Sequence, residues 1–355
     1  MVTTNLNAWP ACRPVHASRL KFKFAADPKV VSRADSVDLL AHKVFTDYMG
    51  WADSEKDRFA PMSVSPTVSF LHYSTSCFEM MKVDRKLRLF RSEYNCLIKK
   101  PCEVECSKWL SKSCHGEFLR IRPTLIGTDA SLGFQVPSEV LLVMLVSYWP
   151  APTGPPKGLR LLCSGKDAVR SWPGETGSAK VSGNYAPSLL VQGEAKRRGC
   201  DLVLWLFEPE GYISETGSAN FFVIWRAPQG ELQLVTAPLS GHLILGGVTR
   251  RSVLDLARER VGEKAGSSSE CEKLEVVEKC FTVIDLVEAS KCGGLVDAFF
   301  VGTACFMQPV VHIMEKAPHV SIIRSRIKDI MFGHEDNAWA DEITEEQRDN
   351  NRGKD

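Results

Sequence analysis

Several short segments in the first half of the chain alternate between apolar and polar positions. Residues Lys86–Arg91 (KLRLFR) and Phe118–Gly127 (FLRIRPTLIG) follow this two-residue period, which is typical of a strand with one buried face. Arg120 and Arg122 fall two positions apart in the second segment, so both side chains lie on one side of the expected strand. The apolar run Val140–Val146 (VLLVMLV) is far shorter than the roughly 20 residues of a membrane-spanning helix and predicts a buried strand.

A proline-rich segment divides this part of the chain from the rest. The nine residues Tyr148–Pro156 include four prolines, and a segment of this kind cannot form a regular helix or strand. After it, helical and strand-like patterns alternate. The two expected helices cover residues 185–199 and 248–261, and the three expected buried strands cover residues 202–207, 220–225 and 297–305. We expect Thr249 to cap the second helix.

These patterns predict an α/β protein of two domains, which suits a chain of 355 residues. A small N-terminal domain is expected over residues 41–147 and a larger domain over residues 158–340, joined by a linker at residues 148–157. Loose order is expected for residues 1–40, and a disordered tail for residues 341–355.

The composition is that of an ordinary globular protein, with 44% hydrophobic and 25% charged residues. A formal net charge of +1 gives no sign of a basic surface, so neither nucleic acid nor a membrane is expected as a partner. The first 26 residues carry four basic residues and no acidic one, which is the charge bias of a mitochondrial presequence. A disordered cytosolic start explains the same bias, and we expect the protein in the cytoplasm, with mitochondria as the alternative.

The chain has 12 cysteines, and without a secretory signal these are expected to be free thiols. Cys96, Cys102, Cys106 and Cys114, followed by His115, form a cluster. The spacing between its members matches no common zinc module. We therefore expect scattered thiols on an irregular segment rather than a metal site.

Lys180 is the first candidate for chemistry, in the segment GSAKVSGNY (residues 177–185). Its neighbours are small, which leaves room for a flat ring against the backbone beside the amine. Burial lowers the pKa of a lysine, and a neutral amine can form a Schiff base with an aldehyde. Tyr185 can supply a phenol hydrogen bond to such a ring. The ordinary alternatives are a solvated lysine and a half-buried tyrosine.

Glu215 and two glycine turns complete the set of candidates. Glu215 precedes a very apolar strand, and a buried carboxylate there needs a partner such as a protonated pyridine nitrogen. Gly246 and Gly247 lead into the helix that starts at Val248, where free N–H groups favour a phosphate. A similar turn is present at Val301–Cys305. Together these features suit pyridoxal phosphate, a phosphorylated pyridine aldehyde.

Ten segments, in collinear order over roughly residues 40–340, resemble the eukaryotic branched-chain amino-acid aminotransferases of the fold type IV group. They are KVFTDYM (43–49), LHYSTSCFE (71–79), RLFRSEYN (88–95), RIRPTLIGTDASLG (120–133), KVSGNYAPSLL (180–190), LVLW (202–205), ETGSANFF (215–222), LGGVTRR (245–251), GTAC (302–305) and DIMFGHEDNAW (329–339). The resemblance implies two α/β domains with pyridoxal phosphate between them. It implies transamination between a branched-chain or related hydrophobic L-amino acid and 2-oxoglutarate. It also implies a homodimer in which the loop near residues 71–79 reaches the neighbour's site.

The resemblance assigns roles to single residues. Lys180 matches the lysine that binds the cofactor and moves the proton, Tyr185 matches the partner of the ring's phenolic oxygen, and Glu215 matches the acid on the ring nitrogen. The remaining cofactor positions are Leu245, Val248, Thr249 and Thr303. The substrate positions are Phe45, Tyr73, Phe78, Arg120, Arg122, Ser218, Ala219, Thr303 and Ala304. Among these, Arg122 matches the arginine that receives the side-chain carboxylate of glutamate.

Several positions depart from the family, mostly in the first domain. Cys96–Pro101 stands where the family has a helix with a phosphate-binding arginine, and a family segment after it is missing. Lys99 and Lys100 are the candidate substitutes, as point charges without the fork geometry of arginine. Arg120 stands in place of a pocket tyrosine, and Met80 in place of a glycine.

Three explanations of these departures stay open from the sequence. The chain is a working but divergent aminotransferase, a pseudoenzyme that acts as a partner subunit, or the product of an incorrectly spliced gene. Among enzymes of the same fold type, the runner-up is a D-amino-acid aminotransferase or an aminodeoxychorismate lyase. The segments RIRPTLIGT and GVTRR favour the branched-chain group over these.

Overall fold

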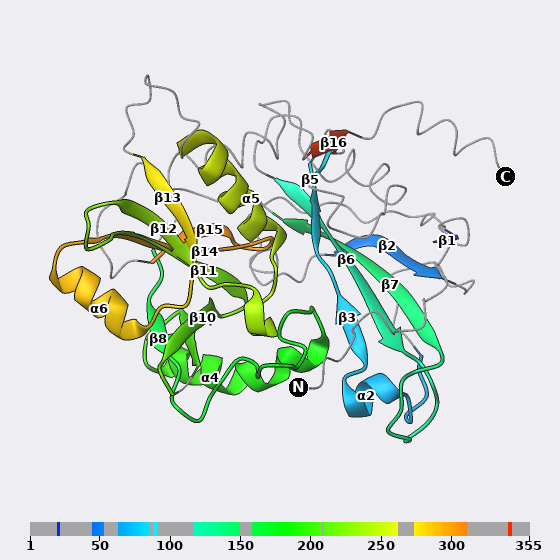
Figure 1. Ribbon diagram of the computed structural model, residues 1–355. Helices are drawn as coiled ribbons and strands as arrows, with labels where there is room; N and C mark the ends of the chain where they lie inside the picture. Colours follow the sequence, from blue (N-terminus) through cyan, green and yellow to red (C-terminus); the bar gives the residue numbers. More distant parts are fainter. Residues whose placement is uncertain are drawn as a thin grey trace.

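The computed structural model consists of two β-sheets that lie beside each other, with helices mainly on the second (Figure 1). The structure describes residues 20–21, 45–52, 63–84, 88–90, 117–149, 158–207, 209–261, 273–310 and 340–342. The two sheets and the helices between their strands give an α/β fold. In the part of the chain that the structure describes, no helix is both long and apolar enough to cross a lipid bilayer.

The first sheet is built mainly from the N-terminal half of the chain. Its strand order is β1-β2-β7-β6-β4-β5-β16, with β3 paired to β6, and all of these pairs are antiparallel. The strands are β1 Leu20–Lys21, β2 Phe45–Ala52, β3 Ser76–Phe78, β4 Met81–Val83, β5 Arg88–Phe90, β6 Phe118–Gly127, β7 Val140–Trp149 and β16 Ala340–Glu342. A short helix, α2 (Ser69–Tyr73), precedes β3.

β6 and β7 form the central pair of this sheet. The bounds of β6 are those that the alternating pattern predicts. Leu119 and Ile121 are fully buried, whereas Arg120 and Arg122 are only partly buried, as the two-residue period requires. The predicted apolar strand is the first part of β7. This pair therefore presents two arginines on the face opposite its core.

The second sheet carries the larger core. Its order is β13-β12-β11-β10-β9-β8, and β14 pairs with β11 and β15. The strands are β8 Leu161–Cys163, β9 Leu202–Phe207, β10 Tyr212–Thr216, β11 Ala219–Arg226, β12 Leu232–Thr236, β13 Leu274–Glu278, β14 Leu295–Gly302 and β15 Phe306–Pro309. The pairs β12–β13 and β8–β9 are parallel. Every residue of β11 except its last is buried, because side chains pack against both faces of this central strand.

Three helices connect these strands: α4 Ala186–Arg197, α5 Val248–Leu256 and α6 Val283–Lys291. A π-helical turn, Ala257–Val261, extends α5 to the predicted end of the helix. The predicted cap of α5 is wrong. Gly247 is the N-cap residue, with an extended backbone, and no side chain caps the helix. Thr249 lies one residue inside the first turn, which leaves its hydroxyl free for another role.

The expected domain boundaries remain predictions, but two strands bear on them. β7 continues through Tyr148 and Trp149, two residues into the expected linker. β16 pairs with β5 in the first sheet, and it includes Asp341 and Glu342, which we expected in the disordered tail. Backbone hydrogen bonding to β5 orders these two residues and returns the chain to the first sheet.

Candidate functional site

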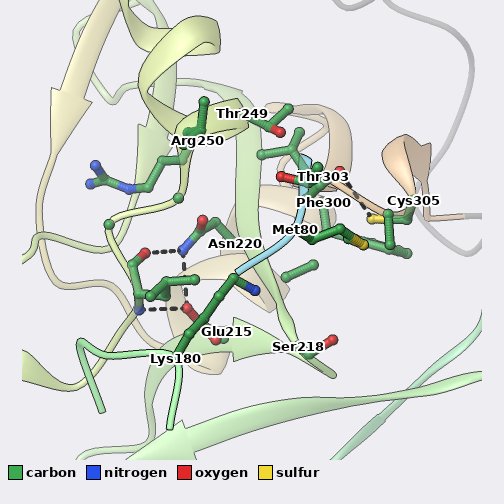
Figure 2. Close-up of a pocket in the computed structure, with 18 of the residues that line it drawn as sticks. Met80, Lys180, Glu215, Ser218, Asn220, Thr249, Arg250, Phe300, Thr303 and Cys305 are labelled. Carbon is green, nitrogen blue, oxygen red and sulfur yellow. Dashed lines mark hydrogen bonds between the residues drawn. The ribbon is translucent and has the colours of Figure 1, made fainter. Parts of the chain in front are cut away.

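A cavity of about 790 Å³ lies where the two sheets meet (Figure 2). Residues of β3 and β6 line one side, and residues of the second sheet, the start of α5 and the turn after β14 line the other. The cavity brings together most of the site residues predicted from the sequence. These are Phe78, Arg122, Lys180, Tyr185, Glu215, Ser218, Ala219, Leu245, Val248, Thr249, Thr303 and Ala304.

Lys180 enters the cavity from a loop that the first sheet holds in place. The backbone N–H of Phe78 donates a hydrogen bond of 2.9 Å to the Lys180 carbonyl. On the other side, Asn184 donates from Nδ2 to the Ala179 carbonyl at 2.9 Å. Burial lowers the pKa of the Lys180 amine, although the nearby Glu79 carboxylate opposes this shift. The amine is therefore uncharged more often than that of a surface lysine, and an uncharged amine can act as a nucleophile or take up a proton.

Glu215 lies in β10 and is almost completely buried, with 1% of its surface exposed. Its Oε2 is 2.5 Å from Nε of Arg170. Its Oε1 accepts hydrogen bonds from Nδ2 of Asn220 at 3.0 Å and from the backbone N–H of Leu245 at 2.8 Å. Burial raises the pKa of this carboxyl group, and the charge of Arg170 opposes the rise. Three donors thus hold the carboxylate in one orientation beside the cavity.

Tyr185 and Phe78 form an aromatic wall of the cavity. Their ring centroids are 5.0 Å apart. Burial raises the pKa of the Tyr185 phenol, with the charge of Arg170 acting in the opposite direction. The phenol therefore keeps its proton over a wide pH range and can donate a hydrogen bond into the cavity.

The start of α5 is a candidate anion site. The first N–H groups of a helix have no partner within the helix, and here no side chain supplies one. Val248 and Thr249 line the cavity at this point. Gly247 is required for close packing, because a Cβ atom there would lie 2.4 Å from Oδ1 of Asn220. Figure 2 shows Thr249 and Thr303 toward the same end of the cavity.

Arg122 and Arg120 differ in their relation to the cavity. Arg122 lines it, with its guanidinium carbon 4.5 Å from the centre of the Phe78 ring. Nε of Arg122 is buried and has no hydrogen-bond partner among the described residues, and a buried donor of this kind calls for an explanation. Arg120 is outside the described lining of the cavity. Its Nε donates a hydrogen bond of 3.0 Å to Oγ of Ser147, and its guanidinium carbon lies 5.1 Å from the centre of the Trp149 ring. Burial, and then the charge of Arg122, lower the pKa of Arg120.

Besides Arg120, two further predicted substrate residues are missing from the described lining of the cavity. Tyr73 lies in α2, where its hydroxyl donates to the Leu132 carbonyl at 2.5 Å and its ring packs edge-to-face on Phe134. Phe45 lies in β2, but its side chain is outside the described part. The candidate phosphate substitutes Lys99 and Lys100, and the cysteine cluster at residues 96–114, also lie outside the described residues.

The sequence did not point to Arg170 or Asn220, although both contact Glu215. Asn220 carried a weak signal, because it is the one polar residue at the start of the apolar segment NFFVIW. Arg170 carried no signal, since 44 residues separate it from Glu215 in the chain. Met80 also lines the cavity, at a position noted in the sequence only as the loss of a glycine.

The donor set of the cavity fits a flat pyridine ring with a phosphate group. A buried carboxylate suits a protonated ring nitrogen, an amine of lowered pKa suits an aldehyde, and a phenol suits a ring oxygen. The uncapped N-terminus of α5 suits the phosphate. Arg122 also lines the cavity and is a candidate to bind a second anion.

The chain is similar to known proteins over most of its length. The profile of the family described as "Amino-transferase class IV" matches residues 102–313. The mitochondrial branched-chain-amino-acid aminotransferase of Schizosaccharomyces pombe is 34% identical over 351 residues, which cover 83% of this chain and 78% of that protein. The cytosolic enzyme of Saccharomyces cerevisiae is 35% identical over 351 residues, which cover 87% of this chain and 88% of that protein. Similar relatives thus include mitochondrial and cytosolic forms.

Solved structures have the same fold. The branched-chain amino acid aminotransferase of Thermobaculum terrenum, in its PLP-bound holo-form, superposes with a TM-score of 0.61 and 19% identity, covering 84% of this chain and 99% of that chain. The branched-chain aminotransferase of Escherichia coli superposes with a TM-score of 0.64 and 23% identity, covering 84% of this chain and 99% of that chain. At these identities the likeness shows the fold alone.

Proposed function

The chain belongs to the class IV aminotransferase family, and on this premise we propose that it is a pyridoxal-phosphate-dependent branched-chain-amino-acid transaminase. It moves an amino group between a branched-chain L-amino acid and 2-oxoglutarate. One observation carries the proposal: a lysine of lowered pKa and a buried glutamate line the same cavity as an uncapped helix start.

Different residues of the cavity would bind different parts of the cofactor. Pyridoxal phosphate, when bound, supplies an aldehyde and an electron-accepting ring. Lys180 would hold the aldehyde carbon, Glu215 the ring nitrogen and Tyr185 the phenolic oxygen. Val248, Thr249 and Thr303 would hold the phosphate, with the backbone N–H groups of the helix start as donors.

Lys180 is also the group that carries the proton at the reacting carbon. Because burial lowers its pKa, Nζ of Lys180 is uncharged more often than the amine of an exposed lysine and can take up a proton. The hydrogen bond from Phe78 to the Lys180 carbonyl fixes the backbone from which this amine extends. Short-range proton transfer depends on this kind of positioning.

Arg122 and the apolar wall together explain how one pocket can accept two kinds of substrate. The guanidinium of Arg122, which lines the cavity, can bind the side-chain carboxylate of 2-oxoglutarate or glutamate. Phe78, Met80 and Ala219 give an apolar surface for a branched side chain. In the proposed reaction the two kinds of side chain occupy this space in turn.

We propose a homodimer, supported by an exposed apolar surface near α2. Tyr73, Leu132, Phe134 and Val136 are exposed there, and Phe134 has 91% of its surface accessible. Burying such a surface against a second copy would remove it from water. The surface adjoins β3, which carries Phe78 into the site. Sedimentation at several concentrations should show a dimer, and Phe134→Asp should weaken it; a monomeric parent protein would contradict this part.

We propose the cytoplasm as the compartment of the protein. The similar relatives include a mitochondrial and a cytosolic enzyme, so both compartments are candidates. The weak basic bias of the N-terminal residues is compatible with either compartment. Cell fractionation of the tagged full-length protein, followed by detection in the mitochondrial and cytosolic fractions, tests this assignment. Recovery in mitochondria would overturn it.

The central experiment is an amino-donor screen on purified protein with added pyridoxal phosphate and 2-oxoglutarate. Leucine, isoleucine and valine should each yield glutamate. Borohydride should fix the cofactor to Lys180, as peptide mass spectrometry would detect. Lys180→Ala should lose activity by about 100- to 10,000-fold and lose the labelled peptide. A folded protein that binds no cofactor and yields no glutamate from these donors would refute the proposal and leave a non-catalytic partner subunit as the explanation.

A further inference from the structure

We propose that Arg170 is a positioning residue of the site, which holds Glu215 as a carboxylate and ties it to the loop that carries Lys180. The inference rests on the proposed function, because it concerns how that site is kept ready. Arg170 is outside the described lining of the cavity, so it acts through other residues and not on the substrate.

The guanidinium of Arg170 makes contacts in three directions. Nε lies 2.5 Å from Oε2 of Glu215, and only 7% of the Arg170 side chain is exposed. Nη1 donates to the carbonyl of Gly177 at 2.9 Å and to the carbonyl of Leu243 at 2.8 Å. A rigid planar group that bonds in several directions fixes the relative positions of its partners.

These partners belong to three parts of the site that are far apart in the chain. Gly177 lies three residues before Lys180, and Leu243 lies two residues before Leu245, whose N–H contacts Glu215. Ser171, next to Arg170, donates to the same Leu243 carbonyl at 2.7 Å. The side chain thus connects the lysine loop, the acid and the segment that leads to α5.

The Arg170 contacts also depend on close packing around the lysine loop. A Cβ atom on Gly177 would lie 2.4 Å from Oγ of Ser171 and 2.5 Å from the carbonyl oxygen of His242. The loop therefore approaches both segments as closely as a glycine allows. Oγ of Ser178 and Nδ1 of His242 are 3.2 Å apart, which adds a further contact between the same two segments.

The charge of Arg170 has a separate effect on Glu215. The charged or titratable groups that act on this carboxyl are Arg170, Lys180 and Arg250, and Tyr185 interacts with it electrostatically. Arg250 is bonded to its own acid, Glu278, at 2.7 Å. Lys180 has a lowered pKa and loses its charge readily. Arg170 is therefore the cation that favours the ionised form of Glu215 when the lysine is neutral.

Asn220 offers a matched comparison with Arg170. It also donates to Glu215, at 3.0 Å, and to the Leu245 carbonyl at 2.8 Å, but it carries no charge. Removing either residue takes one donor from Glu215. Only the loss of Arg170 also removes a positive charge, so the two variants separate charge from hydrogen bonding.

The test compares wild-type holoenzyme with Arg170→Met, Asn220→Leu, Glu215→Gln and the double variant Arg170→Met/Glu215→Gln. Arg197→Met serves as a surface control, because Arg197 is exposed and pairs with Glu194 along α4. Three quantities are measured: the dissociation constant of pyridoxal phosphate by its visible absorbance, the pH profile of kcat/KM, and the melting temperature.

We expect Arg170→Met to weaken pyridoxal phosphate binding by about 10- to 100-fold, the scale of a lost hydrogen bond to a charged group. Without the nearby cation the pKa of Glu215 should rise further. As the pH is lowered, activity that requires the ionised acid should then be lost at a higher pH than in wild type. Asn220→Leu should weaken binding without this shift, and Arg197→Met should change neither quantity.

The double variant separates positioning from a merely structural role. If Arg170 acts largely through Glu215, its removal should reduce kcat/KM less once Glu215→Gln has removed the charge, with the remaining loss due to the carbonyls of Gly177 and Leu243. Additive losses in the double variant, or an unshifted pH profile in Arg170→Met, would overturn the proposal. If Arg170→Met does not fold, Arg170→Lys replaces it. The lysine keeps the charge but not the fork, so cofactor affinity equal to wild type would overturn the proposal.

A failure of the proposed function has a different signature. In that case the wild-type protein itself would bind no pyridoxal phosphate and transfer no amino group. An active wild type with an unaffected Arg170→Met variant would refute only the role of Arg170.

Discussion

The backbone N–H of Phe78 donates to the carbonyl oxygen of Lys180 at 2.9 Å, so a strand of the first sheet holds the reactive loop of the second. An isolated antiparallel β-bridge between Cys77 and Val181 continues this contact. Oγ of Ser76 also donates a hydrogen bond of 2.7 Å to Oγ of Ser182. The Phe78 ring then lies 5.4 Å from Nζ of Lys180. The two sheets are thus joined at the residue on which the chemistry depends, and the substrate side of the site is built from the first sheet.

Replacing Arg122 with methionine should separate the two substrates. The change removes a cation that lines the cavity beside Phe78, so the KM for 2-oxoglutarate should rise by about 10- to 100-fold. The KM for leucine should change much less, because an apolar side chain makes no use of the charge. Steady-state kinetics with each substrate varied in turn give both values. Equal increases in the two KM values would show that Arg122 supports the pocket as a whole and does not bind the carboxylate.

Replacing Arg120 with tyrosine should improve the use of branched-chain donors. A cation near an apolar pocket is costly to bury, and burial together with Arg122 lowers the pKa of Arg120. We expect kcat/KM for leucine, isoleucine and valine to rise several-fold, because the change removes a partly buried positive charge next to Arg122. Ser147→Ala is the control, because it removes only the hydrogen-bond partner of Arg120. Unchanged kinetics in Arg120→Tyr would mean that this residue has no influence on the pocket.

Local patterns were sufficient for much of the fold. The bounds of β6 and β9 are those expected from alternation and from the apolar run LVLWLF. Both signals are local, because each strand was predicted from the pattern of apolar and polar residues within it. The start of α5 was correct, but its cap was not, because the extended backbone of Gly247 defines the cap and Thr249 follows inside the helix.

The candidate site was predictable only where a residue type carries its own chemistry. Lys180 and Glu215 were found because an isolated lysine among small residues and an acid beside an apolar strand are unusual. Arg170 and Asn220 were not found, because their roles arise from contacts with Glu215 that only folding creates. Tyr73 was expected in the pocket from resemblance, but within the described single chain its hydroxyl contacts Leu132 instead.

Gly247→Ala should disturb the cofactor site through Asn220. The new Cβ atom would lie 2.4 Å from Oδ1 of Asn220, so Asn220 must move and weaken its bonds to Glu215 and to the Leu245 carbonyl. We expect a loss of roughly 1–3 kcal/mol in the free energy of unfolding and weaker pyridoxal phosphate binding. Chemical denaturation and cofactor titration measure the two effects.

Gly193 provides the control for that substitution. It lies within α4, and a Cβ atom there would meet no atom within 4 Å. Gly193→Ala should therefore stabilise the protein by roughly 0.5–1 kcal/mol, because alanine favours the helix. If both alanine variants have the same stability and cofactor affinity, the close contact at Gly247 is not what shapes the site.

Cys305 should be the least reactive of the described thiols. It lines the cavity, and burial raises the pKa of its thiol from 9.0 to about 11. Since the thiolate is the reactive form, alkylation of Cys305 by iodoacetamide at pH 8 should be about 100-fold slower than that of the exposed Cys280. Peptide mass spectrometry at a series of times gives both rates.

The raised pKa of Cys305 also predicts a pH dependence of stability. The folded state holds the thiol proton more tightly than the unfolded chain, so this contribution is fully present below pH 9.0 and is lost as the pH rises through about 11. In Cys305→Ala the free energy of unfolding should fall less steeply with pH over this interval. Denaturant unfolding of both proteins at several alkaline pH values measures the difference. Parallel curves for the two proteins, or equal alkylation rates for Cys305 and Cys280, would show that the Cys305 thiol ionises as freely as an exposed one.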